Sequence, residues 1–208
     1  MRKVLFIDNF DSFTYNLVDE FLSRDCYVSV LRNNIHYSML SKDIRKNGYG
    51  LIVISPGPST PSHAGVCKDL IRDVRGEIPV FGVCLGHQAI CEVYGGQTLR
   101  CSEIYHGKHC KIRHDSNGIF TGVSNPFTVG RYHSLCCGGF EESDLSVNAS
   151  TESGIVMGVE DSENRVWGVQ FHPESILTAE GSIIIDNVID MSFSGGIDGI
   201  QEFNGKTV

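Results

Sequence analysis

Hydrophobic residues fall in short, evenly spaced runs along the first half of the chain. We predict buried strands at these runs, which are Val4–Asp8, Tyr27–Leu31, Leu51–Ser55 and Val80–Val83. Between them, apolar residues recur with the period of a helix and predict helices near 13–23, 66–75 and 85–95, with Asp11 or Ser12 as a cap for the first. Strands that alternate with helices at this spacing indicate an α/β fold with a mostly parallel, open, three-layer sheet.

The pattern changes after Gly96, where short β-like runs separated by Gly and Asn turns replace the helices. These runs are Lys111–His114, Phe127–His133, Ile155–Glu160 and Val166–Phe171. They predict an antiparallel or mixed extension of the same sheet. A last helix is predicted near 180–191, so we expect one domain over residues 1–193 and a weakly ordered tail over 194–208.

Composition and charge narrow the possible functions. A chain of 208 residues with 41% hydrophobic residues can bury the core of one domain, and its formal net charge of -8 argues against nucleic acid as a partner. No run approaches the roughly 18 apolar residues of a membrane span, and the N-terminus reaches Asp8 too soon for a signal peptide. We therefore expect a cytoplasmic protein with no membrane partner, whose eight cysteines are free thiols.

One cysteine stands in a position suited to catalysis. Cys84 directly follows the Val80–Val83 strand, precedes a helix, and is flanked by Gly82 and Gly86. A G-x-C-x-G turn between strand and helix is the thiol counterpart of the nucleophile elbow, which lifts one side chain clear of the sheet edge. Backbone N–H groups at the helix N-terminus favour a thiolate there. We predict that Cys84 is a nucleophile rather than a small buried hydrophobic residue.

A candidate base follows the last predicted strand. His172 comes at the end of that apolar run, and Pro173 fixes the backbone so that the Glu174 carboxylate can lie on the same side as the imidazole. A cysteine nucleophile needs a base within hydrogen-bond reach and a third group that orients the base. By itself, His-Pro-Glu also fits a capping histidine beside a surface glutamate. Together with the elbow, it predicts a catalytic set of Cys84, His172 and Glu174.

Several motifs, in the same order, resemble those of class I (triad) glutamine amidotransferases. The three main ones are Ser55–Pro58, Gly82–Gln88 and Gly168–Ser175. The segments Ile7–Leu17, His106–Lys108 and Arg131–Leu135 narrow the resemblance to the glutaminase components of anthranilate synthase and aminodeoxychorismate synthase. The resemblance runs from about residue 3 to residue 191 and implies a flavodoxin-like core.

The resemblance implies a role for each matched residue. Cys84 would attack the side-chain amide of L-glutamine, while His172, oriented by Glu174, would protonate the departing ammonia and then activate water. Backbone N–H groups of Gly57 and Leu85 would form the oxyanion hole. The implied glutamine pocket consists of Gly57, Pro58, Ser59, Gln88, Ser134 and Leu135. No cofactor and no metal are implied, and the ammonia would pass to a chorismate-binding synthase, the large subunit of a hetero-oligomer.

Two other functions fit the same residues. A γ-glutamyl hydrolase or a peptidase of the same fold would also use an elbow cysteine and a histidine, although the Asp8–Leu17 and Arg131–Leu135 motifs favour the amidotransferase. A catalytically silent regulatory subunit is disfavoured because all three catalytic residues are present. The product pathway, tryptophan or folate, stays open, with Val30–Asn34 favouring anthranilate synthase slightly.

The remaining candidate groups are assigned to packing. Cys101, His106, His109, Cys110 and His114 could be drawn as a zinc site, but their spacing fits poorly with common zinc motifs. We expect loop histidines and buried thiols there, and packing roles for His87, His133 and the Cys136–Cys137 pair. Ser194–Gly199 is similar to the phosphate loop of ATP pyrophosphatase domains, but nine residues after Gly199 are too few for a nucleotide-binding fold.

Overall fold

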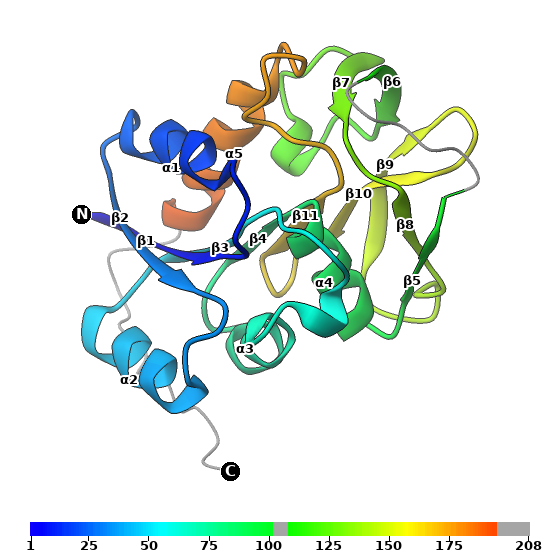
Figure 1. Cartoon of the computed structure of the whole chain (residues 1–208). Helices are drawn as coiled ribbons and strands as arrows, with labels where there is room; N and C mark the ends of the chain where they lie inside the picture. Colours follow the sequence, from blue (N-terminus) through cyan, green and yellow to red (C-terminus); the bar gives the residue numbers. More distant parts are fainter. Residues whose placement is uncertain (102–107, 195–208) are drawn as a thin grey trace.

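The computed structural model of the chain describes residues 1–101 and 108–194 (Figure 1). Its larger sheet has the strand order β2-β1-β3-β4-β11-β10-β9-β6-β7. The first five of these strands run parallel: β2 (Cys26–Arg32), β1 (Arg2–Asp8), β3 (Leu51–Ile54), β4 (Val80–Val83) and β11 (Val166–Val169). The predicted α/β fold with a mostly parallel central sheet is confirmed.

The predicted antiparallel extension is also confirmed. It consists of β10 (Val156–Asp161), β9 (Ser146–Thr151), β6 (Lys108–His114) and β7 (Phe127–Arg131). Two further strands, β5 (Gln97–Arg100) and β8 (Leu135–Gly138), pair antiparallel in a small second sheet. The sequence did not predict β5, β8 or β9, because β5 is largely exposed and β9 alternates too few apolar residues to stand out.

Helices cover both faces of the parallel strands, as the three-layer prediction requires. One face carries α1 (Thr14–Leu22) and α5 (Gly181–Phe193), which lie beside each other in Figure 1. The other face carries α2 (Tyr37–Asn47), α3 (Cys67–Val74) and α4 (Leu85–Val93). Two short 3-10 turns, η1 (Pro61–His63) and η2 (Gly118–Phe120), complete the described elements.

Strand β1 shows how the sequence divides the core between these faces. Val4 and Phe6 pack on the side of α1 and α5, whereas Leu5 and Ile7 pack on the side of α2, α3 and α4. Successive strand residues point to opposite faces, so a uniformly apolar strand is covered on both. The core is therefore two hydrophobic layers, one on each side of the sheet.

Two local predictions need correction. Helix α2 was not predicted, because only Leu40 and Ile44 of its residues are buried and its other side chains are mostly polar. Helix α1 has Phe13 at its N-cap with no side-chain cap bond. Asp11 instead stabilises the preceding turn, where its carboxylate accepts a 2.7 Å hydrogen bond from the Phe13 N–H.

All eight cysteines are free thiols in the structure. Within residues 1–101 and 108–194, no helix has the length and hydrophobicity needed to cross a membrane. The predicted tail from residue 195 onward, including most of the Ser194–Gly199 segment, lies outside the described residues, as do His106 and Gly107.

Candidate active site

The candidate catalytic residues lie at the carboxyl edge of the parallel strands. Strand β4 is bracketed by β3 and β11, and Val83 is paired with Val169. Directly beyond this pair, the Cys84 N–H donates a 2.9 Å hydrogen bond to the Val169 carbonyl. His172 follows three residues after Val169, so the sheet itself brings the two predicted catalytic side chains to one edge.

The elbow at Cys84 depends on the glycines around it. Cys84 has φ 53° and ψ -98°, a backbone conformation that residues with a side chain rarely adopt. A Cβ atom on Gly82 would lie 2.5 Å from the Gly86 carbonyl carbon, and one on Gly86 would collide with the Ile54 carbonyl. The predicted role of the G-x-C-x-G turn is therefore visible as close backbone packing of α4 on β3 and β4.

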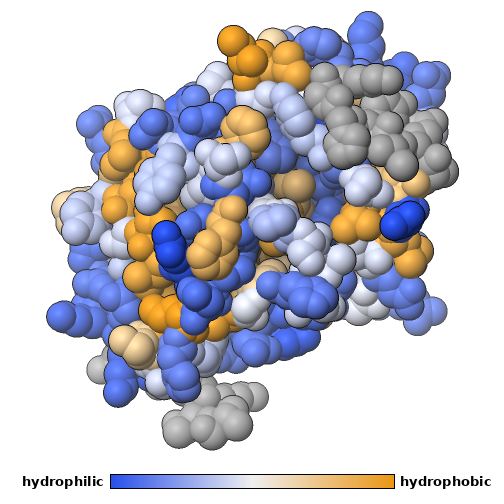
Figure 2. Space-filling view, in the orientation of Figure 1, coloured by the Kyte–Doolittle hydropathy of each residue, from blue (hydrophilic) through white to orange (hydrophobic). Residues whose placement is uncertain are grey.

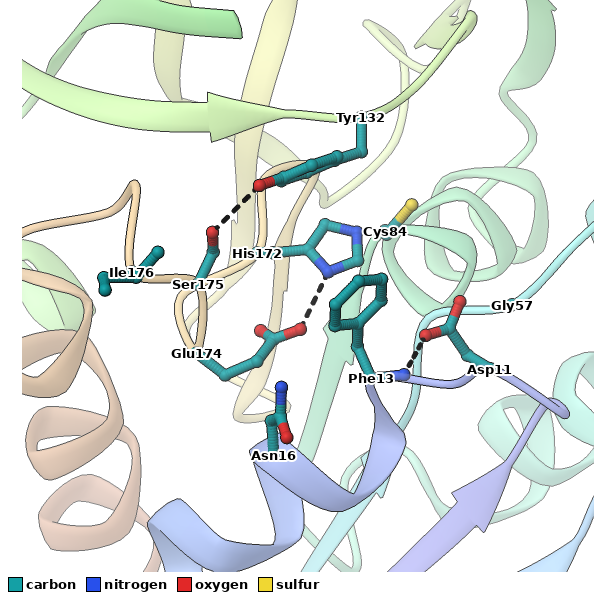
Figure 3. Close-up of a pocket in the computed structure, with 10 residues that line it drawn as sticks. All are labelled: Asp11, Phe13, Asn16, Gly57, Cys84, Tyr132, His172, Glu174, Ser175 and Ile176. Carbon is teal, nitrogen blue, oxygen red and sulfur yellow. Dashed lines mark hydrogen bonds and ion pairs between the residues drawn. The ribbon is translucent and has the colours of Figure 1, made fainter. Parts of the chain in front are cut away.

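His172 is held by a carboxylate, as the sequence predicted. Its Nδ1 lies 2.7 Å from Glu174 Oε1, and the two side chains are only 8% and 1% exposed (Figure 3). The intervening turn is fixed by Thr178, whose hydroxyl donates to the His172 carbonyl at 2.8 Å. A Cβ atom on Gly181 would collide with the Pro173 carbonyl, so the start of α5 packs tightly against this turn. The imidazole therefore has a fixed position.

Two aromatic rings flank the imidazole edge-on. Their centroids lie 6.3 Å (Phe13) and 5.3 Å (Tyr132) from the His172 ring, at angles of 79° and 70°. The Tyr132 hydroxyl is in turn within 3.2 Å of Ser175 Oγ. These contacts limit rotation of the imidazole and exclude water from its sides.

The protonation of His172 follows from its neighbours. Burial by itself lowers the pKa of His172, but hydrogen bonds and charges from Cys84 and Glu174 outweigh this effect and raise the pKa to about 10. The imidazole therefore holds a proton at neutral pH. A protonated imidazole between a sulfur and a carboxylate can donate a proton to a leaving group and take it back.

A cavity of about 360 Å³ opens onto these groups (Figure 3). Four predicted residues line it: Gly57, Cys84, His172 and Glu174. Its other lining residues are Asp11, Phe13, Asn16, Tyr132, Ser175 and Ile176. Gly57, in the loop after β3, and Cys84, in the turn after β4, therefore line one cavity.

Gly57 and Leu85, the predicted oxyanion pair, lie against each other. A Cβ atom on Gly57 would be 2.7 Å from Leu85 Cδ2 and 2.5 Å from Asn9 Cβ, so only glycine lets the loop lie against these two side chains. Asn9 anchors the loop, because its amide donates to the Ser55 carbonyl at 2.8 Å.

The other predicted pocket residues surround the elbow without lining this cavity. Pro58 and Ser59 are exposed on the loop after Gly57, and Ser59 has φ 73°. Gln88 is buried on α4, where its Nε2 donates to Gln170 Oε1 at 3.2 Å. Ser134 and Leu135 lie at the start of β8 and offer backbone carbonyls to the Cys101 N–H and the His133 ring.

A comparison with known protein families identifies the family of this chain. The family described as "Glutamine amidotransferase class-I" matches residues 5–191. The chain is a class I glutamine amidotransferase. This agrees with the family resemblance inferred from its motifs.

Relatives and solved structures agree with this family. The amidotransferase is 45% identical to an anthranilate synthase component 2 of Buchnera aphidicola, over 91% of this chain and 94% of that one. It is 41% identical to the bifunctional protein TrpGD of Thermotoga maritima, over 92% of this chain and 32% of that one. A structure described as a putative GMP synthase subunit from Thermoplasma acidophilum shares its fold, with TM-score 0.82, 24% identity and coverage of 93% and 95%.

Six cavity residues of the amidotransferase were not assigned a role from the sequence. Phe13 and Asn16 belong to the Ile7–Leu17 motif and Tyr132 to the Arg131–Leu135 motif, so family motifs marked them without revealing their contacts. Asp11 and Ser175 also lie in such motifs, Ile7–Leu17 and Gly168–Ser175, and only Ile176 lies outside them. How the turns that carry these residues meet at the cavity is not shown by local sequence.

His133 has a structural position near this site. Its Nδ1 donates to the Leu135 carbonyl at 2.6 Å, and its Nε2 accepts from Arg131 Nε at 3.1 Å. Burial lowers the pKa of His133 to about 4, so the ring is neutral at pH 7. It thereby fixes the backbone of Leu135, in agreement with the packing role expected for it.

The residues considered for a zinc site have other contacts. The ring of His114 uses both nitrogens, one accepting from the Ser116 N–H at 3.1 Å and the other 3.1 Å from the Ser124 carbonyl. Cys101 Sγ lies 3.8 Å from His133 Nδ1. His106, another member of that set, is outside the described residues.

Proposed function

We propose that this chain hydrolyses L-glutamine to glutamate and ammonia with a triad of Cys84, His172 and Glu174. The observation that carries the proposal is the 2.7 Å contact between His172 Nδ1 and a buried carboxylate, on an imidazole that shares a cavity with Cys84. A histidine held through Nδ1 keeps Nε2 for the nucleophile and the substrate. A cavity of about 360 Å³ also suits a substrate the size of an amino acid.

The reaction proceeds in two half-reactions. Cys84 Sγ forms a bond to the amide carbon of glutamine, and the carbonyl becomes an oxyanion. His172 gives its proton to the amide nitrogen, the C–N bond breaks, ammonia leaves and a γ-glutamyl thioester remains. Water then gives a proton to His172 while its oxygen attacks the thioester, and the C–S bond breaks to release glutamate and the sulfur of Cys84.

Backbone donors stabilise the oxyanion in this proposal. The N–H groups of Gly57 and Leu85 are proposed as the two donors because Gly57 lines the cavity and Leu85 directly follows Cys84. Preorganised donors of this kind are worth about 3–4 kcal/mol each. Glutamine itself is proposed to contact Gly57 and the surrounding Pro58, Ser59, Gln88, Ser134 and Leu135.

The ammonia is proposed to pass to a chorismate-using synthase, with anthranilate synthase favoured over aminodeoxychorismate synthase. Relatives that share 40–45% identity and are described as anthranilate synthase component 2 support this order. Exposed hydrophobic residues at the cavity support a docked large subunit, since Phe13 is 48% and Ile176 97% exposed. Figure 2 shows hydrophobic side chains gathered at the top of this face, over the segment between β11 and α5.

Glutamate release, measured with and without the large subunit of each synthase, tests the function. We expect the large subunit of anthranilate synthase to increase glutamine turnover, and Cys84→Ser to abolish both this turnover and labelling by an electrophilic glutamine analogue. Cys110→Ser, which removes another half-buried thiol, should behave like the parent. Cleavage of γ-glutamyl peptides without a partner, with glutamine turned over more slowly, would favour the hydrolase instead.

The domain limits and the location are part of the same proposal. Residues 1–193 are proposed to form the whole amidotransferase domain, and the family match over residues 5–191 supports this. Eight free thiols suit a reducing compartment, which supports a cytoplasmic location. A chain truncated after Phe193 should keep its glutaminase activity and its unfolding temperature.

A further inference from the structure

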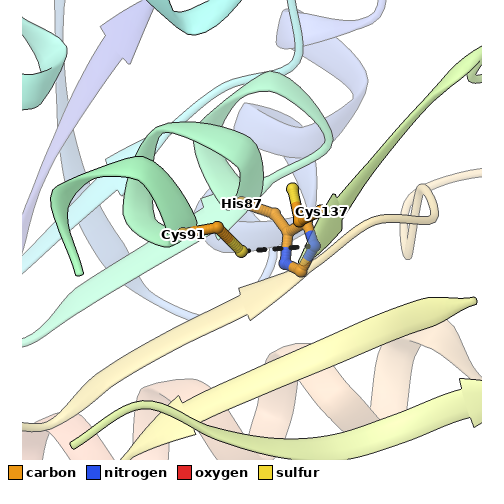
Figure 4. A group of neighbouring side chains, drawn as sticks. All are labelled: His87, Cys91 and Cys137. Carbon is orange, nitrogen blue, oxygen red and sulfur yellow. Dashed lines mark hydrogen bonds between the residues drawn. The ribbon is translucent and has the colours of Figure 1, made fainter. Parts of the chain in front are cut away.

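Three potential metal ligands meet behind the catalytic cysteine, outside the site described above. His87 and Cys91 lie one turn apart on α4, and Cys137 lies on the neighbouring strand β8 (Figure 4). Their ligand atoms are all within 4.8 Å of one another, and no other such group occurs in residues 1–101 and 108–194. From the sequence we had expected only packing roles for His87 and Cys137, which lie far apart in the chain.

The distance between two of these ligand atoms matches the one that a small metal ion would impose. Cys91 Sγ lies 3.8 Å from His87 Nε2. A metal bound at about 2.3 Å to sulfur and about 2.0–2.1 Å to nitrogen holds these ligand atoms roughly 3.6–3.8 Å apart. His87 and Cys91 are therefore already at the separation of metal ligands, and the pairs with Cys137 lie within 4.8 Å.

The imidazole of His87 has no conventional hydrogen-bond partner. The whole residue is 0% exposed, its Nε2 has a thiol as neighbour, and its Nδ1 is without a partner among the described residues. A buried polar nitrogen that is left without a partner costs on the order of 1–3 kcal/mol. Nε2 is therefore the nitrogen that faces Cys91 Sγ and is available to a metal ion, whereas Nδ1 lies on the side of Gly168.

The two thiols differ in their surroundings. Cys91 on α4 is 0% exposed, whereas Cys137 on β8 is 8% exposed. The Thr98 hydroxyl, opposite Cys137 in the β5–β8 pair, also lies against this sulfur and is buried. Groups that contact a ligand sulfur in this way commonly orient it in metal sites.

We propose that His87, Cys91 and Cys137 bind one thiophilic d10 metal ion, Zn²⁺ or Cu⁺, which ties α4 to β8 behind the catalytic cysteine. Two thiolates and an imidazole are the ligands that such ions prefer. With Zn²⁺ the buried site is electrically neutral after both thiols have released their protons, and with Cu⁺ three ligands complete the coordination. Because α4 begins beside Cys84, the ion stabilises the helix that carries the nucleophile.

Metal retention by the full chain tests the site. The background variant Cys84→Ser removes the accessible catalytic thiol, and the protein is reduced, unfolded and refolded anaerobically with Zn²⁺ or Cu⁺ before desalting. We expect about one equivalent of one of these ions to be retained, together with a higher unfolding temperature. Adding Cys91→Ala and Cys137→Ala should abolish both effects, whereas Cys26→Ala, which removes a buried thiol elsewhere, should preserve them.

A second measurement covers variants that fail to fold. Co²⁺ bound to the folded protein should give near-ultraviolet sulfur-to-metal absorption, and Cys91→Ser should lose about half of it because one of two thiolates is removed. Retention of the same metal without Cys91 and Cys137, or no retention by the Cys84→Ser protein, would overturn the proposal. A third result would also overturn it: the reduced protein retains no metal, and peroxide treatment joins Cys91 and Cys137 in a disulfide. The pair would then be a redox couple.

Discussion

The substitution Glu174→Gln tests whether a buried charge sets the protonation of the catalytic imidazole. The pKa of His172 is about 10, against an ordinary value of 6.5, which corresponds to on the order of 5 kcal/mol in favour of the imidazolium. Cys84 and Glu174 share this stabilisation. The substituted side chain has nearly the same shape as Glu174, but its hydrogen bond to His172 is neutral instead of charge-assisted, at a cost of about 2 kcal/mol. We therefore expect kcat for glutamine hydrolysis to fall roughly 30-fold.

The assay is glutamate release as a function of pH and glutamine concentration, with the partner subunit present. KM should change much less than kcat, because Glu174 acts through the imidazole. The alkaline decline of activity should move to lower pH, since His172 loses a partner that favours its charged form. Glu163→Gln makes the same chemical change on an exposed residue before β11 and should leave both quantities unchanged. An unchanged kcat and an unmoved alkaline limb in Glu174→Gln would refute the reasoning.

Three further changes test the elbow and its surroundings. Cys84→Gly should abolish activity but raise the free energy of unfolding by about 1 kcal/mol, because glycine adopts φ 53° without strain. Denaturant titrations measure this, and a protein less stable than the parent would contradict backbone strain at Cys84. Gly86→Ala should destabilise by about 2–3 kcal/mol through its collision with the Ile54 carbonyl, while Gly138→Ala, with open space around it, should be nearly neutral in the same titration. The pKa of His133 is lowered to about 4 in the folded protein, so its contribution to stability is complete above pH 6.5 and is lost as pH falls toward 4, by up to about 3 kcal/mol. In His133→Gln the free energy of unfolding should therefore depend less steeply on pH. A slope identical to that of the parent would count against this.

The sequence predicted those elements whose own residues form a continuous run or a periodic pattern of apolar side chains. Each residue of β3 and β4 is buried, so continuous apolar runs marked both strands. Helix α2 was not predicted because it contributes only two buried side chains, and strand β9 was not predicted because two of its three buried residues, Asn148 and Thr151, are polar. Local pattern predicts an element only when that element carries its own hydrophobic face.

The same distinction applies to the site. Cys84, His172 and Glu174 sit in short motifs whose chemistry can be deduced from neighbouring residues. The ring contacts of Phe13 and Tyr132 with His172 join three elements and could not be deduced from any one of them. Cys137 likewise meets α4 only because β5 and β8 form a second sheet beside it.

Strand order explains how a strained nucleophile is tolerated. Strand β4 lies between β3 and β11, so Cys84 has the Gly57 loop on one side and the turn of His172 on the other. Strain of about 1–3 kcal/mol at one residue is small beside the burial of four complete strand residues next to it. A slip of β11 by one residue would turn its side chains to the opposite face and separate the imidazole from the sulfur. The paired register of Val83 with Val169 therefore holds Cys84 and His172 at the same edge of the sheet.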